Sequence, residues 1–353
     1  MTRTTPPRPL DIEAVFPELS AHRATSTRLH PRPGTPAAHE SSIGGPFLWP
    51  ADEPWPVCRE PHPRDGGRRV ADVYRERTVL REAWTRNPGV GPADEDRVLL
   101  ATLREDHHVP DRTDVTPIPL LPLAQLFTRD VPGLVAPEGA DLVQVLWCPF
   151  DGHGPQGAPG VHVRWRSSSE CQEILTAPPL PEVVGFGGYL PEPCVIAPEQ
   201  VVEHEYVEHL DSDLRERIEA WETQLEEETE EETGEETGDD EEEAEEEAEG
   251  AILTYHHDLS VAAGWKVGGY AKWNVTGPAC ATCSCGSSMR LFLTVATSEW
   301  DGIISSWTPL EDRQTPSPQD IKHPTEVVVG RGGSLNIFTC AADPRHEHSV
   351  FLQ

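Results

Sequence analysis

Cysteine and histidine residues gather at two places in this chain of 353 residues, and each group has the composition of a zinc site. In the first group, Cys58 and His62 form one close pair, and Cys148 and His153 form a second pair further along. Zinc binds four nitrogen or sulfur ligands tetrahedrally, and structural sites commonly take two from one turn and two from another. The two pairs therefore predict a Cys2His2 zinc site in the first half of the chain.

The second group lies closer to the C-terminus. It consists of Cys280, Cys283, Cys285 and Cys340, followed by Asp343, His346 and His348. The Cys-x2-Cys spacing that begins at Cys280 is typical of a zinc knuckle. The remaining ligands would come from Cys340 and from one of the three side chains that follow it. The spacing does not choose among those three, and we include His346 in the predicted set.

Two other interpretations of these groups stay open. Free cysteine is usually a small buried apolar residue, in which case Cys148 and Cys340 are core residues at strand ends. If metal binds, a closed four-ligand site is structural, whereas an open coordination position would suit a metal-dependent hydrolase. The sequence does not distinguish a closed site from an open one.

Signatures of other catalytic chemistry are absent from the sequence. No G-x-S-x-G turn marks a nucleophilic serine. His204 and His209 flank carboxylates, but they are five residues apart and would not share a helical face as a His-Glu-x-x-His motif requires. We therefore assign no catalytic residue, and a non-enzymatic protein is favoured.

The elements around the two groups look like copies of one another. A Gly-Gly-aromatic turn, a cysteine group, an apolar strand, and a strand that ends in cysteine recur in one order. The two strands lie at 120–126 and 142–148 in the first copy, and at 290–296 and 334–340 in the second. We predict a β-dominated α+β fold, in which two similar antiparallel-sheet halves form one pseudo-symmetric duplicated unit with peripheral helices.

The predicted halves span 41–210 and 251–353, and residues 1–40 are predicted to be a poorly ordered leader. The first half is interrupted at 63–116 by an insertion, where apolar residues from Val70 to Trp84 recur at helical spacing. Residues 211–250 are predicted to form a helix followed by a disordered acidic linker.

The charge of the chain is strongly acidic, at −33, and much of it is local. Residues 222–249 hold 18 Asp or Glu and no Lys or Arg, so this block repels itself. It is either a docking segment for a basic protein partner or a solubilising insertion. The lack of a basic stripe argues against nucleic-acid binding, and an acidic surface repels anionic membranes.

The N-terminus lacks the apolar core of a signal peptide, and no run approaches the ~20 apolar residues of a membrane span. We therefore expect a cytoplasmic location, where cysteines stay reduced and clustered ones bind metal rather than form disulfides.

Several short motifs together resemble those of the YwqG-like proteins, a bacterial family of unknown function, in its actinobacterial form. They are Gly44-Gly-Pro-Phe-Leu-Trp-Pro50, Trp55-Pro-Val-Cys58, Leu142–Pro149, Val163-Arg-Trp-Arg166, Pro191-Glu-Pro-Cys194, Lys266-Val-Gly-Gly-Tyr270, Cys285-Gly286 with Met289, and Phe338-Thr-Cys340. The resemblance implies a mostly antiparallel β fold of two similar halves, and it implies no established activity. One departure is the string Cys340-Ala-Ala-Asp343-Pro344, where related sequences look as if they carry Cys-x2-Cys-Pro.

These observations favour a non-enzymatic cytosolic binding or interaction protein with structural zinc. A metal-dependent hydrolase that uses a Cys/His-bound metal is one alternative. A toxin-neutralising, immunity-type protein is another.

Overall fold

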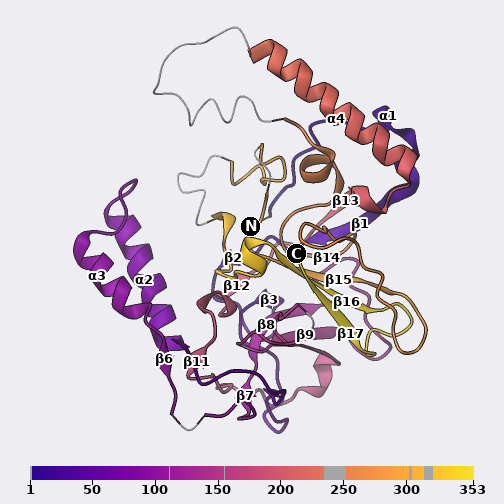
Figure 1. The fold of residues 1–353 in the computed structure, drawn as a ribbon. Helices are drawn as coiled ribbons and strands as arrows, with labels where there is room; N and C mark the ends of the chain where they lie inside the picture. Colours follow the sequence, from indigo (N-terminus) through magenta and orange to yellow (C-terminus); the bar gives the residue numbers. More distant parts are fainter. Residues whose placement is uncertain (1, 111, 155, 234–251, 302–303, 314–320) are drawn as a thin grey trace.

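The computed structural model describes residues 2–110, 112–154, 156–233, 252–301, 304–313 and 321–353. Two six-stranded sheets form its centre and helices lie at its periphery (Figure 1). Neighbouring strands within both sheets run antiparallel. The prediction of a β-dominated α+β fold with antiparallel sheets is confirmed.

The first sheet has the strand order β10 (Val161–Arg166), β9 (Leu142–Trp147), β8 (Leu121–Phe127), β3 (Ser42–Ile43), β12 (Cys194–Val195) and β2 (Arg32–Pro33). The second sheet has the order β17 (His348–Leu352), β16 (Ser334–Cys340), β15 (Met289–Ala296), β14 (Lys266–Gly268), β1 (Arg23–Arg28) and β13 (Glu199–His204).

Both sheets follow the same plan. In each, a short first strand, β3 or β14, pairs with β8 or β15, which is followed by β9 or β16 and then by the edge strand β10 or β17. On its other side, the first strand pairs with a strand from the opposite part of the chain, because β12 lies beside β3 and β1 lies beside β14. Each sheet therefore contains an inner strand that lies far along the chain from the strand it pairs with.

The ladders of the two sheets also match residue by residue. Gln125 faces Gln144 in the first sheet, and Thr294 faces Asn336 in the second. Each ladder shifts its register at the corresponding place, between Pro122 and Ala124 in β8 and between Leu291 and Leu293 in β15. Positions in one sheet can therefore be equated with positions in the other by their place in the ladder.

An apolar core lies between the two sheets. Side chains two apart on one strand share a face. Accordingly Val143 and Val145 of β9 join Leu293 and Val295 of β15 in one buried cluster. Trp165 of β10 also reaches across, with its ring centroid 5.8 Å from that of Phe292. Gln144 and Thr294 lie between these positions on their strands. Their side chains therefore point to the other face of each sheet, away from this core.

The N-terminal segment is ordered, so the prediction of a poorly ordered leader over 1–40 is wrong. It contains α1 (Ile12–Val15), the 3₁₀ helix η1 (Pro17–His22), β1 and β2. Ile12, Phe16 and Leu19 are buried against α4 (Ser212–Thr233). The many prolines and arginines hid this organisation, because the segment is stabilised by distant contacts rather than by local periodicity.

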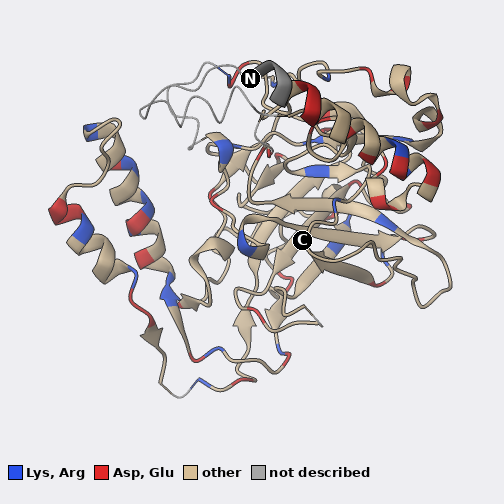
Figure 2. Ribbon diagram, turned by 45° about the horizontal axis from the view of Figure 1, so that its top comes forward, with Lys and Arg blue, Asp and Glu red and all other residues tan. Residues whose placement is uncertain are grey.

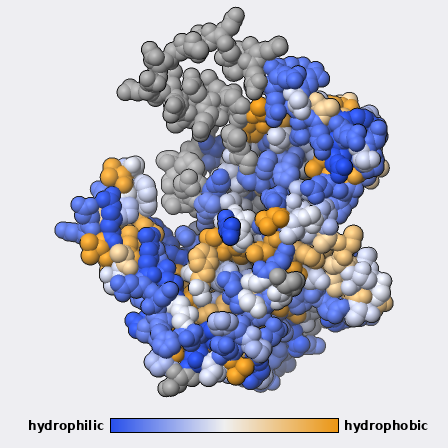
Figure 3. Space-filling view, in the orientation of Figure 1, coloured by the Kyte–Doolittle hydropathy of each residue, from blue (hydrophilic) through white to orange (hydrophobic). Residues whose placement is uncertain are grey.

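The predicted insertion forms a lobe beside the first sheet, visible at the left of Figure 1. It contains α2 (Val70–Arg86), which confirms the predicted helix, and α3 (Asp94–Leu103), next to a small sheet of β11 (Val183–Val184), β5 (Gly66–Arg69) and β6 (His107–His108). Apolar residues on these helices stay partly exposed, with Trp84 at 48% and Val98 at 71%. Figure 3 shows apolar patches on this lobe among hydrophilic surface.

The acidic tract is helical where the structure describes it. α4 runs through Thr233, so the prediction of disorder from residue 222 is wrong for 222–233, and 234–249 lie outside the described residues. The helix is held at Trp221, whose ring packs edge-on to Phe16 with a centroid distance of 5.9 Å. Figure 2 shows acidic residues along this helix. Among the described residues, no helix has the length and apolar character to span a membrane.

The remaining short elements connect these parts. They are β4 (Val57–Cys58), which pairs with β7 (Ile118–Pro119), the 3₁₀ helices η2 (Ser168–Glu170), η3 (Gly187–Tyr189), η4 (Val207–His209) and η6 (Gly330–Gly332), and the π-helical turn η5 (Tyr255–Ser260).

Candidate metal centres

The first group of ligand candidates converges at one end of the first sheet. Cys58 ends β4 and His62 follows in the loop, whereas Cys148 directly follows β9 and His153 lies in the connection to β10. One donor atom from each side chain lies within 4.8 Å of the others, and all four residues are buried. We call these four residues the first cluster.

The distances in the first cluster suit tetrahedral coordination. The sulfur of Cys58 lies 3.4 Å from Nε2 of His62 and 3.3 Å from Nε2 of His153, and the sulfur of Cys148 lies 3.4 Å from Nε2 of His62. Zinc bond lengths of about 2.3 Å to sulfur and about 2.0–2.1 Å to nitrogen put the edge of such a tetrahedron at about 3.5 Å. The four donor atoms therefore surround a volume of the size that zinc needs.

The protonation of the histidines favours the same chemistry. Burial lowers the pKa of His62 and of His153, so both imidazoles stay neutral at physiological pH. Nδ1 of His62 lies 3.1 Å from the carbonyl oxygen of Pro63, to which it donates when protonated. This hydrogen bond leaves the lone pair of Nε2 directed at the sulfurs, as is usual for a zinc-bound histidine.

Burial, together with the neighbouring Cys58, raises the pKa of the Cys148 thiol. A buried thiolate without a counter-charge is costly, and a bound cation would offset that cost. Among the described residues, the positive charge of Arg64 lies near enough to lower the pKa of Cys148 in part.

Arg64 is a residue that the sequence analysis did not single out. Its buried guanidinium donates to the carbonyl oxygens of Cys58, His62 and Thr116 at 3.3, 3.2 and 2.8 Å, and it also contacts the carbonyl oxygen of Glu60. These bonds fix the loop that carries two of the four ligands. In the sequence, Arg64 is marked only by its position two residues after His62. No spacing rule predicts the role of an arginine at that position.

The second group converges at the corresponding end of the second sheet. Cys283, Cys285, Cys340 and His346 have donor atoms within 4.8 Å of one another, and we call them the second cluster. The sulfurs of Cys285 and Cys340 are 3.5 Å apart, far beyond a disulfide bond of about 2.05 Å and close to a tetrahedral S···S edge of about 3.8 Å. Cys283 and Cys340 are buried, whereas Cys285 and His346 are exposed.

A tight turn builds the first half of the second cluster. The amide of Gly286 donates to the carbonyl of Cys283 at 2.8 Å, and Gly286 has φ +86°, a conformation that glycine adopts without strain. The backbone amide of Ser287 lowers the pKa of the Cys285 thiol to about 6. On the other half, the amide of Asp343 lowers the pKa of Cys340. Amides directed at sulfur thus stabilise thiolates here.

The structure separates the remaining candidates from the second cluster. Cys280 is exposed and lines a neighbouring apolar pocket with Trp273 and Phe338. The carboxylate of Asp343 accepts from the amide of Arg345 at 2.9 Å, and His348 begins β17 with Nε2 3.1 Å from the carbonyl oxygen of Val161. Of the three side chains left open after Cys340, His346 is the one that reaches the cluster.

The two clusters occupy equivalent places in the two sheets. In each, two ligands come from the connection between the first and second strands of the series, β3 to β8 or β14 to β15. A third lies at the end of the next strand, at Cys148 or Cys340, and the fourth lies in the loop before the edge strand. The same topology therefore creates the same kind of site twice.

No protein-family model matches the chain, and no curated protein matches it either. The function is therefore inferred from the side chains that the fold brings together.

Proposed function

We propose that this is a non-enzymatic binding or interaction protein in which a structural zinc ion stabilises one end of each sheet. The observation that carries the proposal is the first cluster, in which two cysteines and two histidines are buried together at tetrahedral spacings. Such a set links the β4 loop to the end of β9, two segments that are distant in sequence. Metal binding at this point would contribute directly to folding.

The donor set favours zinc among common metals. Mixed thiolate and imidazole ligands suit zinc, whereas calcium and magnesium prefer oxygen ligands. The second cluster has three cysteines and one histidine, another common structural zinc set.

The number of ligands supports a structural rather than a catalytic role. A catalytic zinc keeps one position for water or substrate, and each cluster already offers four protein ligands. This argument weighs against the metal-dependent hydrolase, and no described contact specifically favours the toxin-neutralising alternative.

The matching strand orders, register shifts and cluster positions support an internal duplication. They also fit the two-halved antiparallel fold expected from the resemblance to YwqG-like proteins. Eight free cysteines fit a reducing cytoplasmic compartment, and the acidic residues of α4 fit a basic protein partner.

Zinc content per chain tests the proposal. Elemental analysis of untagged protein should find two zinc ions. The double variants Cys58→Ser/Cys148→Ser and Cys283→Ser/Cys340→Ser should each retain one. Cys194→Ser is the matched control, because this buried cysteine lies outside both clusters and should leave both ions bound. Wild-type protein without metal above background would contradict the proposal.

A further inference from the structure

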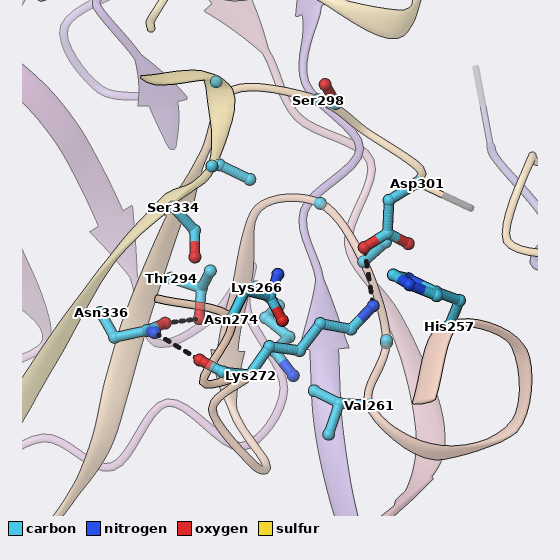
Figure 4. Close-up of a pocket in the computed structure, with 16 residues that line it drawn as sticks. His257, Val261, Lys266, Lys272, Asn274, Thr294, Ser298, Asp301, Ser334 and Asn336 are labelled. Carbon is cyan, nitrogen blue, oxygen red and sulfur yellow. Dashed lines mark hydrogen bonds and ion pairs between the residues drawn. The ribbon is translucent and has the colours of Figure 1, made fainter. Parts of the chain in front are cut away.

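A polar pocket of about 170 Å³ lies in the second sheet, apart from the two clusters (Figure 4). Its floor is formed by β14, β15 and β16, and its wall by segments 261–264, 272–274 and 298–301. The polar side chains that matter here are Lys272, Asp301, His257, Asn336, Thr294 and Ser334. Figure 4 shows the ammonium of Lys272 and the ring of His257 both directed toward the carboxylate of Asp301.

The equivalent place in the first sheet is filled. There Leu48, Phe127 and Leu142 form a small apolar cluster, each with no more than 1% of its surface exposed. Phe127 pairs with Leu142 across the ladder, as Ala296 pairs with Ser334 in the second sheet. At the positions equivalent to Phe127 and Leu142, the second sheet thus carries the smaller residues Ala296 and Ser334.

Lys272 takes the place of Leu48. The side-chain amide of Gln144 donates to the carbonyl of Leu48 at 3.0 Å, and that of the equivalent Asn336 donates to the carbonyl of Lys272 at 3.4 Å. The backbone is therefore held in the same way in both sheets. The pocket arises from the change in side chains, from three large apolar residues to two small ones and a charged one.

Several polar atoms around this pocket are not satisfied by the described residues. Oδ1 of Asp301 and Nδ1 of His257 are both buried and have no hydrogen-bond partner there. Nζ of Lys272 donates to Oδ2 of Asp301 at 2.7 Å, which leaves two of its three N–H groups for other acceptors. Buried polar groups are normally hydrogen-bonded, to protein, to ordered water or to a ligand, so these atoms mark places where a hydroxyl oxygen can bind.

The charges around the pocket are balanced. Lys272 is paired with Asp301, and Lys266 is paired with Glu203 at 2.6 Å. An anion or a cation would bring an uncompensated charge into this lining, whereas a neutral molecule would not. The hydroxyl of Thr294 donates to Oδ1 of Asn336 at 2.9 Å, and the side-chain amide of Asn336 donates to the carbonyl of Lys272. The hydroxyl of Ser334 can both donate and accept, which matches hydroxyl groups of a ligand that also do both.

We infer that this pocket binds a small, uncharged, polyhydroxylated molecule no larger than a monosaccharide. Its size agrees, since pockets for drug-sized ligands are larger, at roughly 300–1,000 Å³. Hydroxyl groups of the ligand donate to Asp301 and His257 and accept from Lys272. The inference does not depend on zinc in either cluster.

Calorimetric titration of the full-length protein tests this inference. The probes are D-glucose, D-galactose, D-mannose, myo-inositol and glycerol, with acetate, inorganic phosphate and glycine as charged or zwitterionic comparisons. At least one polyol should bind, and the comparison compounds should not. Asp301→Asn should weaken that binding about 10- to 100-fold, because a hydrogen bond to a charged group is lost.

Ser334→Leu introduces the residue type that the first sheet has at the equivalent position, Leu142. The variant should abolish binding, because the larger side chain fills the pocket. Zinc content and circular dichroism report whether each variant is folded, independently of the pocket. Exposed Arg59→Met is a control that should bind as the wild type does. Three outcomes would overturn the inference: no polyol binding by folded protein, preferential binding of a comparison compound, or polyol binding that Ser334→Leu leaves unchanged.

Discussion

One terminal nitrogen of the Arg64 guanidinium lies 3.9 Å from the sulfur of Cys58, while the rest of the group donates to backbone carbonyls around it. Arg64 is 1% exposed, so this positive charge lies inside the protein next to a candidate thiolate. The arrangement gives Arg64 two roles. It satisfies the carbonyls of the β4 loop, and its charge partly opposes the burial that raises the pKa of Cys148.

Arg64→Met should destabilise the protein by about 3 kcal/mol or more, because several buried carbonyls lose their donor and each costs about 1–3 kcal/mol. Urea unfolding at pH 7 measures this change. Arg59→Met in the same loop is the matched control, since Arg59 is exposed and its loss should change stability by less than about 0.5 kcal/mol. Equal effects of the two variants would show that Arg64 does not stabilise the loop.

Cys280→Ser should leave zinc content unchanged, although Cys280 begins the Cys-x2-Cys pattern. Its side chain is exposed and outside the second cluster, whereas Cys283 lies within it. Elemental analysis of Cys280→Ser and Cys283→Ser, purified in parallel, makes the comparison. Loss of one zinc ion from Cys280→Ser would place Cys280 among the ligands instead.

The stability of metal-free protein should decrease at both ends of the pH range. Burial lowers the pKa of His62 and His153 in the folded state, so the unfolded chain takes up protons more readily and stability is lost as pH falls below about 6.5. The pKa of Cys148 is raised, so the unfolded thiol ionises first and stability is also lost as pH rises above about 9.

Urea midpoints of protein treated with a chelator, taken from pH 5 to pH 10, measure this dependence. His62→Gln/His153→Gln should flatten the acid side alone, because the glutamines do not titrate. An acid slope unchanged in that double variant would assign it to other groups.

Lys266→Met should cost about 3–5 kcal/mol of folding stability, because it leaves Glu203 as an uncompensated buried charge. Nζ of Lys266 lies 2.6 Å from Oε1 of Glu203, and both side chains are at most 1% exposed. Chemical denaturation measures the loss. The double variant Lys266→Met/Glu203→Gln should recover part of it, and the half-buried Lys322→Met is a control that should cost much less. A double variant less stable than Lys266→Met alone would contradict the uncompensated-charge explanation.

Local patterns in the sequence were sufficient to predict several features of the structure. Apolar residues from Val70 to Trp84 recur at helical spacing, and α2 forms there. The pairing of Cys58 and His62 with Cys148 and His153 could be proposed from composition, because short spacings place two ligands in one loop whatever the rest of the fold does. The recurring motifs were likewise visible in the sequence, and the two sheets that contain them share one strand order.

Only the tertiary structure decided which partners meet across long distances. Spacing alone could not choose among Asp343, His346 and His348, because the loop after β16 determines which of them turns toward the cysteines. The pairing of β1 with β14 and of β12 with β3 was hidden for a similar reason. Strand pairing depends on partners far along the chain, and short strands carry little periodicity of their own.

The polar pocket could not be predicted from the sequence, for a further reason. Leu48 and Lys272 follow similar Gly-Gly turns, but the difference between a filled and an open site depends on Phe127, Leu142, Ala296 and Ser334 as well. These residues come from separate strands. Composition and local spacing therefore determined α2 and the candidate ligands, whereas the packing of distant strands determined which ligands converge and where space remains.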